Sequence, residues 1–94
     1  MPESFALYQN QPNPFVASTT FRFDPQRAEA VRLEVFAIGG PRVAALRNAW
    51  MPAGRHSLEW NSWDACGSPV RPGTCLYRIT AGLFRAQRKL VVLP

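Results

Sequence analysis

Residues that could do acid–base or nucleophilic chemistry are few in this 94-residue chain. His56 is the single histidine, and it lies in a run whose polar and apolar residues alternate. A catalytic centre needs a nucleophile, a base and a group that orients the base. No two carboxylates recur at a spacing typical of a catalytic pair; the acidic residues are Glu3, Asp24, Glu29, Glu34, Glu59 and Asp64. We therefore expect a protein without catalytic residues or a cofactor, with His56 as a core or interface side chain.

The stretch from Asn61 to Gly67 has the composition of a weak cation loop, with oxygen ligands beside a glycine. Calcium sites in proteins usually use about 6–8 oxygen ligands, several of them carboxylates. Asp64 is the only carboxylate in this stretch. We expect no metal site, and we expect the side chains of Asn61 and Asp64 to cap a turn instead.

Cys66 and Cys75 are the only cysteines. A structural zinc site needs four ligands, and no further cysteine or histidine stands nearby. A disulfide across this short span would stabilise the fold by about 2.5–3 kcal/mol if it were unstrained, and it would suit an exported protein. Two buried thiols are the alternative. The sequence leaves both states of this pair open.

The chain is basic, with a formal net charge of +5. Clustered lysine and arginine can attract nucleic acid. Most of the basic residues, however, stand between apolar neighbours, where a strand faces solvent; the dense group is Arg85, Arg88 and Lys89. Bases stack on aromatic rings that share an exposed face with basic residues. In the predicted strands the aromatic and the basic residues alternate, which places them on opposite faces. We therefore expect no nucleic-acid partner.

Alternation of apolar and polar residues predicts half-buried strands, at 19–24 and 31–35 most clearly. Further strands are predicted at 42–46, 55–60, 74–80 and 83–93, after a short opening run at 5–9. Glycine, proline and asparagine mark the turns between them. About seven strands at this spacing predict an all-β fold, an immunoglobulin-like β-sandwich of about seven antiparallel strands, forming a single domain over 1–94. No apolar run approaches the roughly 20 residues of a membrane-spanning helix.

Two predicted loops each carry a tryptophan, Trp50 within 48–54 and Trp63 within 61–73. Exposed rings of this kind could form a contact surface for a partner, for example a carbohydrate. The alternative is that they cover an end of the sandwich.

The opening residues resemble a known protein family. Residues 5–15 read Phe-Ala-Leu-Tyr-Gln-Asn-Gln-Pro-Asn-Pro-Phe, and Ser-Thr-Thr-Phe-Arg-Phe follows at 18–23. Both are similar to the start of type A C-terminal sorting domains of type IX secretion, whose opening motif falls here on Asn10, Pro12, Asn13, Pro14 and Phe15. The resemblance runs along the whole chain to Gln-Arg-Lys-Leu-Val-Val-Leu at 87–93, which is similar to the family's basic-then-apolar end. The Ig-like domain of the flagellar hook-capping protein is a relative of this family.

The resemblance implies a role in export by protein–protein recognition. A cargo domain covalently attached upstream would pass through the periplasm to the cell surface or be secreted, and the partner would be the secretion machinery at the outer membrane. The candidate signal residues are Arg88, Lys89, Leu90, Val91, Val92 and Leu93, on a final strand whose edge could accept an added strand. The alternatives are that 90–93 only complete the sandwich, that the chain is a structural spacer as in the hook cap, or that it binds carbohydrate.

Overall fold

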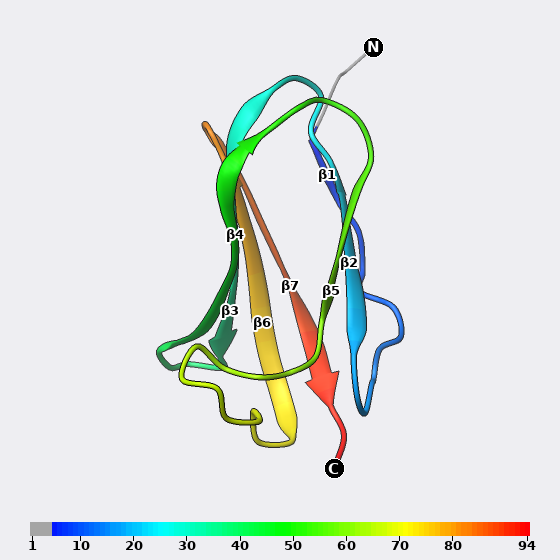
Figure 1. Ribbon diagram of the computed structural model, residues 1–94, viewed down its shortest axis with the longest axis vertical. Helices are drawn as coiled ribbons and strands as arrows, with labels where there is room; N and C mark the ends of the chain where they lie inside the picture. The colour runs from blue at the N-terminus through cyan, green and yellow to red at the C-terminus, as the bar shows by residue number, and fades with distance from the viewer. Residues whose placement is uncertain (1–4) are drawn as a thin grey trace.

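The alternating segments form strands whose apolar side chains meet between two sheets (Figure 1). The computed structural model describes residues 5–94 and contains no helix over that range, hence none that could cross a membrane. One sheet has the order β1-β2-β5, with β1 at Ala6–Leu7, β2 at Thr19–Asp24 and β5 at His56–Trp60. The other has the order β4-β3-β6-β7, with β4 at Arg42–Met51, β3 at Glu29–Ala37, β6 at Gly73–Ala81 and β7 at Phe84–Val92. All strand pairs are antiparallel, which confirms the predicted all-β sandwich.

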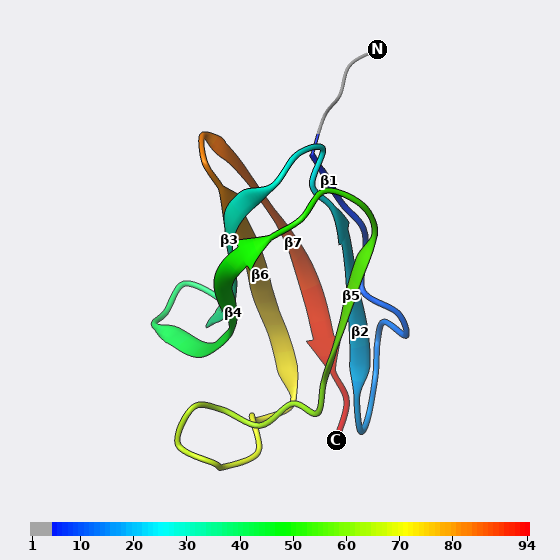
Figure 2. The same cartoon turned by 45° about the horizontal axis from the view of Figure 1, so that its top comes forward.

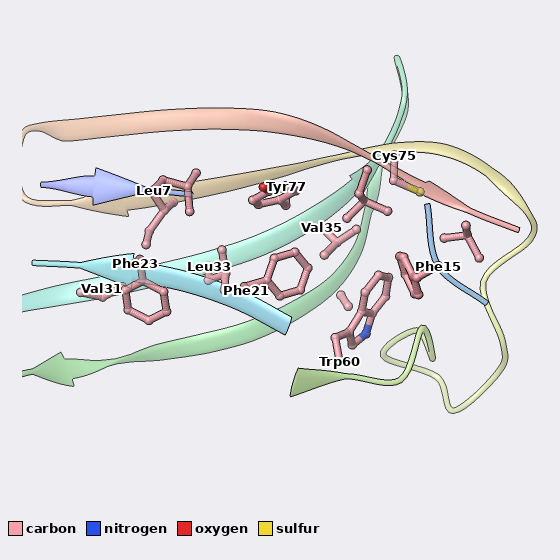
Figure 3. Packing of buried hydrophobic residues seen from close by; sticks show 14 of the residues in the cluster. Leu7, Phe15, Phe21, Phe23, Val31, Leu33, Val35, Trp60, Cys75 and Tyr77 are labelled. Carbon is pink, nitrogen blue, oxygen red and sulfur yellow. The ribbon is translucent and has the colours of Figure 1, made fainter. Parts of the chain in front are cut away.

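The core lies between the sheets and is built from the apolar half of each alternating strand (Figure 3). Phe21 and Phe23 of β2 are buried against the inward residues of the facing sheet, with the Phe21 ring 4.7 Å from that of Tyr77. The other fully buried side chains in this layer are Val31, Leu33, Val35, Ile79 and Leu90. Each buried side chain of this size stabilises the fold by about 1.5–3 kcal/mol relative to an exposed one. The period-two pattern therefore accounts for which face of each strand is inside.

β4 is longer than the sequence predicts. The alternation predicts an end at residue 46, but the strand runs to Met51, so Trp50 lies in a strand and not in a loop. Its ladder with β3 contains two register shifts, one between Leu33 and Glu34 and one between Val35 and Phe36. Each β-bulge inserts an extra residue and moves the following side chains to the other face. Both extra residues, Val43 and Leu46, lie in the first half of β4, within the predicted strand. Beyond them Asn48, Ala49 and Trp50 are all exposed, so no alternation marks the second half as a strand.

The turn between β6 and β7 positions the final strand. Ala81 pairs with Phe84, so the connection is the two-residue turn Gly82-Leu83. Gly82 has φ +60°, a left-handed conformation that costs an ordinary L-residue about 1–2 kcal/mol. Glycine at the first central position is typical of two-residue hairpin turns with this handedness.

We expect Gly82→Ala to lower the free energy of unfolding by at least about 1 kcal/mol, because alanine is strained at this φ and its Cβ would meet the carboxylate of Glu29. Urea denaturation measures the loss. Gly40→Ala is the matched control: Gly40 lies outside the positive-φ region, and its Cβ would make an ordinary 3.4 Å contact with that of Ala37. Equal losses in both variants would contradict this account of the turn.

Candidate recognition site

β7 forms one edge of the four-stranded sheet, since among the strands of residues 5–94 only β6 pairs with it. Its alternate residues face opposite ways. Leu90 and Val92 point into the core, and Arg85, Gln87 and Lys89 lie on the outer face of the sheet. The candidate signal residues are therefore divided between the interior and the surface.

The opening segment of the chain pairs with the far end of β7. The Phe15 N–H donates to the Val91 carbonyl at 3.1 Å, and the Leu93 N–H donates to the Phe15 carbonyl at 2.8 Å. The Asn13 Oδ1 accepts from the Val91 N–H at 2.9 Å, and the Gln9 Nε2 donates to the Lys89 carbonyl at 2.9 Å. We call these four hydrogen bonds, between residues 9–15 and 89–93, the clasp. It joins the two segments that resemble the sorting family into one structural unit; in Figures 1 and 2 the opening segment descends beside β2 to the end of the sandwich where β7 ends.

Asn10 anchors the clasp from inside. Its side chain is fully buried, and its Nδ2 donates to Thr19 Oγ1 at 2.9 Å and to the Pro12 carbonyl at 3.2 Å. The Asn10 N–H donates to the Tyr77 hydroxyl at 2.9 Å, and that hydroxyl donates to the Tyr8 carbonyl at 2.8 Å. Buried polar groups that find partners in this way specify one conformation, whereas each unpaired one costs about 1–3 kcal/mol.

The rest of the opening motif divides between the core and the surface. Phe15 is buried, with its ring centroid 6.1 Å from that of Trp60 (Figure 3). Pro12, Asn13 and Pro14 are exposed and form the turn between Asn10 and Phe15. The spacing of the motif thus places a buried amide, an exposed turn and a buried ring in succession.

The candidate signal residues differ widely in accessibility. Leu90 and Val92 are buried, and Val91 is half-buried. Arg88, Lys89 and Leu93 are exposed, and the Arg88 Nε donates to the Leu7 carbonyl at 3.0 Å. In the folded domain the accessible members of the set are therefore Arg88, Lys89 and Leu93, whereas Leu90 and Val92 complete the sandwich.

Strand order also creates a basic surface that sequence reasoning missed. Cross-strand pairs place four basic side chains on the outer face of the four-stranded sheet: Arg32 of β3, Arg78 of β6, and Arg85 and Lys89 of β7. We call this the basic sheet face. Glu34 lies on the same face, but it is buried and its carboxylate is 3.0 Å from the Arg42 guanidinium. The alternation placed each residue outward, but only the order of the strands brings them together.

The cysteine pair is not joined. Both thiols are free, with Cys66 exposed and Cys75 buried, and burial raises the pKa of the Cys75 thiol. The predicted turn capping is confirmed: Asp64 Oδ1 accepts from the N–H groups of Cys66 and Ser68, each at 2.9 Å, and Asn61 Oδ1 accepts from the Trp63 N–H at 3.2 Å. This turn holds Cys66 at the surface. Among the residues from 5 onward, no three His, Cys, Asp or Glu side chains gather into a group that could hold a metal ion.

Trp50 and Trp63 do not form one surface. Trp50 lies near the end of β4, and Trp63 lies in the 61–72 connection at the opposite end of the sandwich (Figures 1 and 2). His56 is half-buried, as expected of a core or interface side chain, and its ring stacks on Phe23 with centroids 5.6 Å apart. A glycan platform that uses both tryptophans together has no basis in this geometry.

We expect Asn13→Ala to open the clasp locally, because Val91 loses the acceptor for its N–H. The free energy of unfolding should fall by about 0.5–1.5 kcal/mol, and amide hydrogen exchange at Val91 should accelerate more than at residues of β3. Asn48→Ala, an exposed asparagine of β4, is the control and should change neither quantity. Unchanged exchange at Val91 would argue against the clasp in solution.

Burial raises the pKa of the Tyr77 phenol. The unfolded chain then loses this proton at lower pH than the folded chain, so stability is full below the ordinary tyrosine pKa of about 10 and falls as pH rises above it. We expect Tyr77→Phe to be less stable than the parent at pH 7 and to lose less stability between pH 9 and 11. Tyr8→Phe removes an exposed hydroxyl, also with a raised pKa, and controls for the remaining tyrosine. Parallel stability profiles of the parent and Tyr77→Phe would contradict the buried hydroxyl network.

The sandwich is similar to a part of each of several solved structures. No protein-family model and no curated protein sequence matches the chain. A crystal structure of dimeric latent PorU from Porphyromonas gingivalis matches over 99% of this chain with a TM-score of 0.77 and 21% identity. FlgD from Xanthomonas campestris, whose structure gave insights into hook capping, matches over 93% with a TM-score of 0.64 and 22% identity. The DNA glycosylase AlkC from Pseudomonas fluorescens, bound to DNA containing an abasic site analog, matches over 96% with a TM-score of 0.58 and 12% identity. The chain spans 10% of PorU, 64% of FlgD and 30% of AlkC, so what it shares with them is the fold of one β-sandwich.

Proposed function

We propose that this chain is a non-catalytic C-terminal sorting domain that directs an attached cargo protein through type IX secretion. The observation that carries the proposal is the clasp. The opening motif and the basic-then-apolar end resemble the sorting family at two separate places in the sequence, and these two places are bonded to each other. Because the hydrogen bonds of the clasp hold the two segments together, a change in one segment would disturb the other. This supports a single function for both segments.

A folded tag suits an exporter that must handle many cargoes. The machinery at the outer membrane needs a feature that does not depend on the cargo, and a compact sandwich with exposed basic side chains at one edge supplies it. Arg88 and Lys89 are the charged groups that a partner would meet first, and Leu93 adds an apolar contact. The fold, which is similar to a part of latent PorU from Porphyromonas gingivalis, is compatible with a compact tag of this kind.

The proposed route follows from the same resemblance. The cargo is attached upstream of the sandwich, crosses the periplasm and reaches the cell surface or the medium. The partner is a protein of the secretion machinery, and neither a nucleic acid nor a cofactor takes part.

A structural spacer is the second candidate, and the match to FlgD favours it. In that role the sandwich only holds neighbouring parts of a larger protein at a distance. The two candidates differ in what an export assay should give.

We expect a secreted reporter with residues 1–94 fused to its C-terminus to reach the surface of a host that has type IX secretion, because the tag alone carries the recognition. The sandwich domain of FlgD, fused to the same reporter, is the fold-matched control and should leave the reporter in the periplasm. Protease accessibility on intact cells measures the difference. Retention of both reporters in the periplasm would favour the spacer.

Deleting residues 88–94 is a poor test of the signal, because it also removes Leu90 and Val92 from the core. Substitutions of exposed side chains, such as Lys89→Glu, leave the core intact and separate recognition from folding.

A further inference from the structure

The edge of β7 is only partly covered. In the clasp, backbone groups of Lys89, Val91 and Leu93 point away from β6, towards residues 9–15. Backbone groups of alternate strand residues share one direction, so the N–H and C=O groups of Arg85 and Gln87 point to the same edge. No backbone hydrogen bond from the described part of the chain reaches them there. Half of the edge is therefore paired, and the other half, from Arg85 to the N–H of Lys89, is free within the described chain.

The free stretch has defined limits. At its start the ring of Phe5 stacks on that of Phe84, with centroids 4.7 Å apart. At its end the Gln9 Nε2 bonds to the Lys89 carbonyl at 2.9 Å. Between these limits the N–H and C=O of Arg85 and Gln87 remain available for an added strand, which would pair with them as β6 pairs with the other side of β7.

The side chains beside this edge decide what can bind. Arg85, Arg88 and Lys89 are exposed, and Arg78 lies on the neighbouring strand with its Nε 3.4 Å from Gln87 Oε1. If a second copy added its own β7 antiparallel about Gln87, Arg85 of each copy would lie opposite Lys89 of the other. Like charges directly opposite each other destabilise a strand pair, and charged edge residues commonly prevent self-association. The same charges attract an acidic strand.

We propose that the free edge of β7, over residues 85–89, binds an extended acidic segment of a partner protein by strand addition. The segment forms a fifth strand of the four-stranded sheet. Its residues opposite Arg85, Gln87 and Lys89 lie on the basic sheet face and are the acidic ones, since opposite residues of an antiparallel pair share a face. In the proposed sorting role, the partner protein in the secretion machinery would carry such a segment. The identity of the partner therefore rests on the proposed function.

The test uses the intact chain and three labelled heptapeptides in fluorescence anisotropy at low salt. The first, Thr-Glu-Val-Glu-Val-Glu-Thr, alternates acidic and apolar residues. The second replaces each glutamate with lysine. The third keeps the acidic sequence but carries N-methyl groups on the residues whose N–H groups would face β7. We expect the acidic peptide to bind at least tenfold more tightly than either of the others. Equal binding of the N-methylated peptide would overturn strand addition, since charge alone would then explain the affinity; no binding of the acidic peptide would overturn the proposal.

Variants of the chain locate the site. Gln87→Pro removes an N–H that points away from β6 and blocks the edge without deleting a bond to β6, so it should weaken binding of the acidic peptide at least tenfold while circular dichroism and thermal unfolding show a folded sandwich. Gln87→Ala controls for the side chain and should bind like the parent. The double variant Arg85→Glu and Lys89→Glu should prefer the lysine peptide, whereas Arg71→Glu, in the 61–72 connection, should not. Unchanged binding by the folded Gln87→Pro variant would place the peptide elsewhere.

The outcomes separate this inference from the proposed function. Peptide binding is measured on the purified chain, and reporter export is measured in cells. If the Gln87→Pro fusion were still exported, the edge of β7 would have no part in sorting, but the proposed sorting function would stand. If the chain bound the acidic peptide but the reporter were not exported, strand addition at β7 would stand and the proposed sorting function would be contradicted.

Discussion

The hydrogen bonds between the opening segment and the far end of β7 are the constraint on which the rest of this molecule depends. A sandwich made of two open sheets leaves the backbone groups of its edge strands without partners. Here Asn13 and Phe15 satisfy three of those groups, at Val91 and Leu93, and the ring of Phe15 fills the core beside Trp60. Asn10 and the Tyr77 hydroxyl then tie this segment to the middle of the four-stranded sheet. The segment that follows β1, the first strand of the three-stranded sheet, thus closes the edge of the other sheet.

This closure divides β7 into two parts with different chemistry. Residues 89–93 are bonded on both sides, and their apolar members alternate between the core and the surface. Within the described chain the backbone of residues 85–88 is bonded to β6 alone, and two of the three charged side chains of β7, Arg85 and Arg88, lie in this part. A linear tail would present all of these residues equally. In the folded domain, accessibility depends on the clasp, so the surface that a partner meets is a property of the tertiary structure.

The fold also decides where the charged side chains gather. The basic side chains of β3, β6 and β7 meet on one sheet face, and Glu34, the one carboxylate that the described residues place there, is buried beside Arg42. A face of this kind keeps copies of the domain apart and favours acidic partners through long-range attraction. Because long-range attraction of this kind acts on acidic partners of any class, the face does not by itself require the nucleic-acid role that a basic composition first suggests.

The sequence by itself determined which segments are strands and which of their faces are buried, because alternation is a local property of neighbouring residues. That reasoning located β2, β3, β6 and β7 and the sandwich they build. The resemblance to the sorting family, and not the alternation, singled out Asn13 and the residues of the last strand. Reasoning from alternation missed the second half of β4, where Asn48, Ala49 and Trp50 are all exposed and no alternation marks a strand. Only the tertiary structure decided that Asn13 and Val91, 78 positions apart, are hydrogen-bonded, that Cys66 and Cys75 stay apart, and that four basic side chains share one face. These contacts depend on the order of strands in the sheets, and pairing between distant strands leaves no periodic trace in either strand.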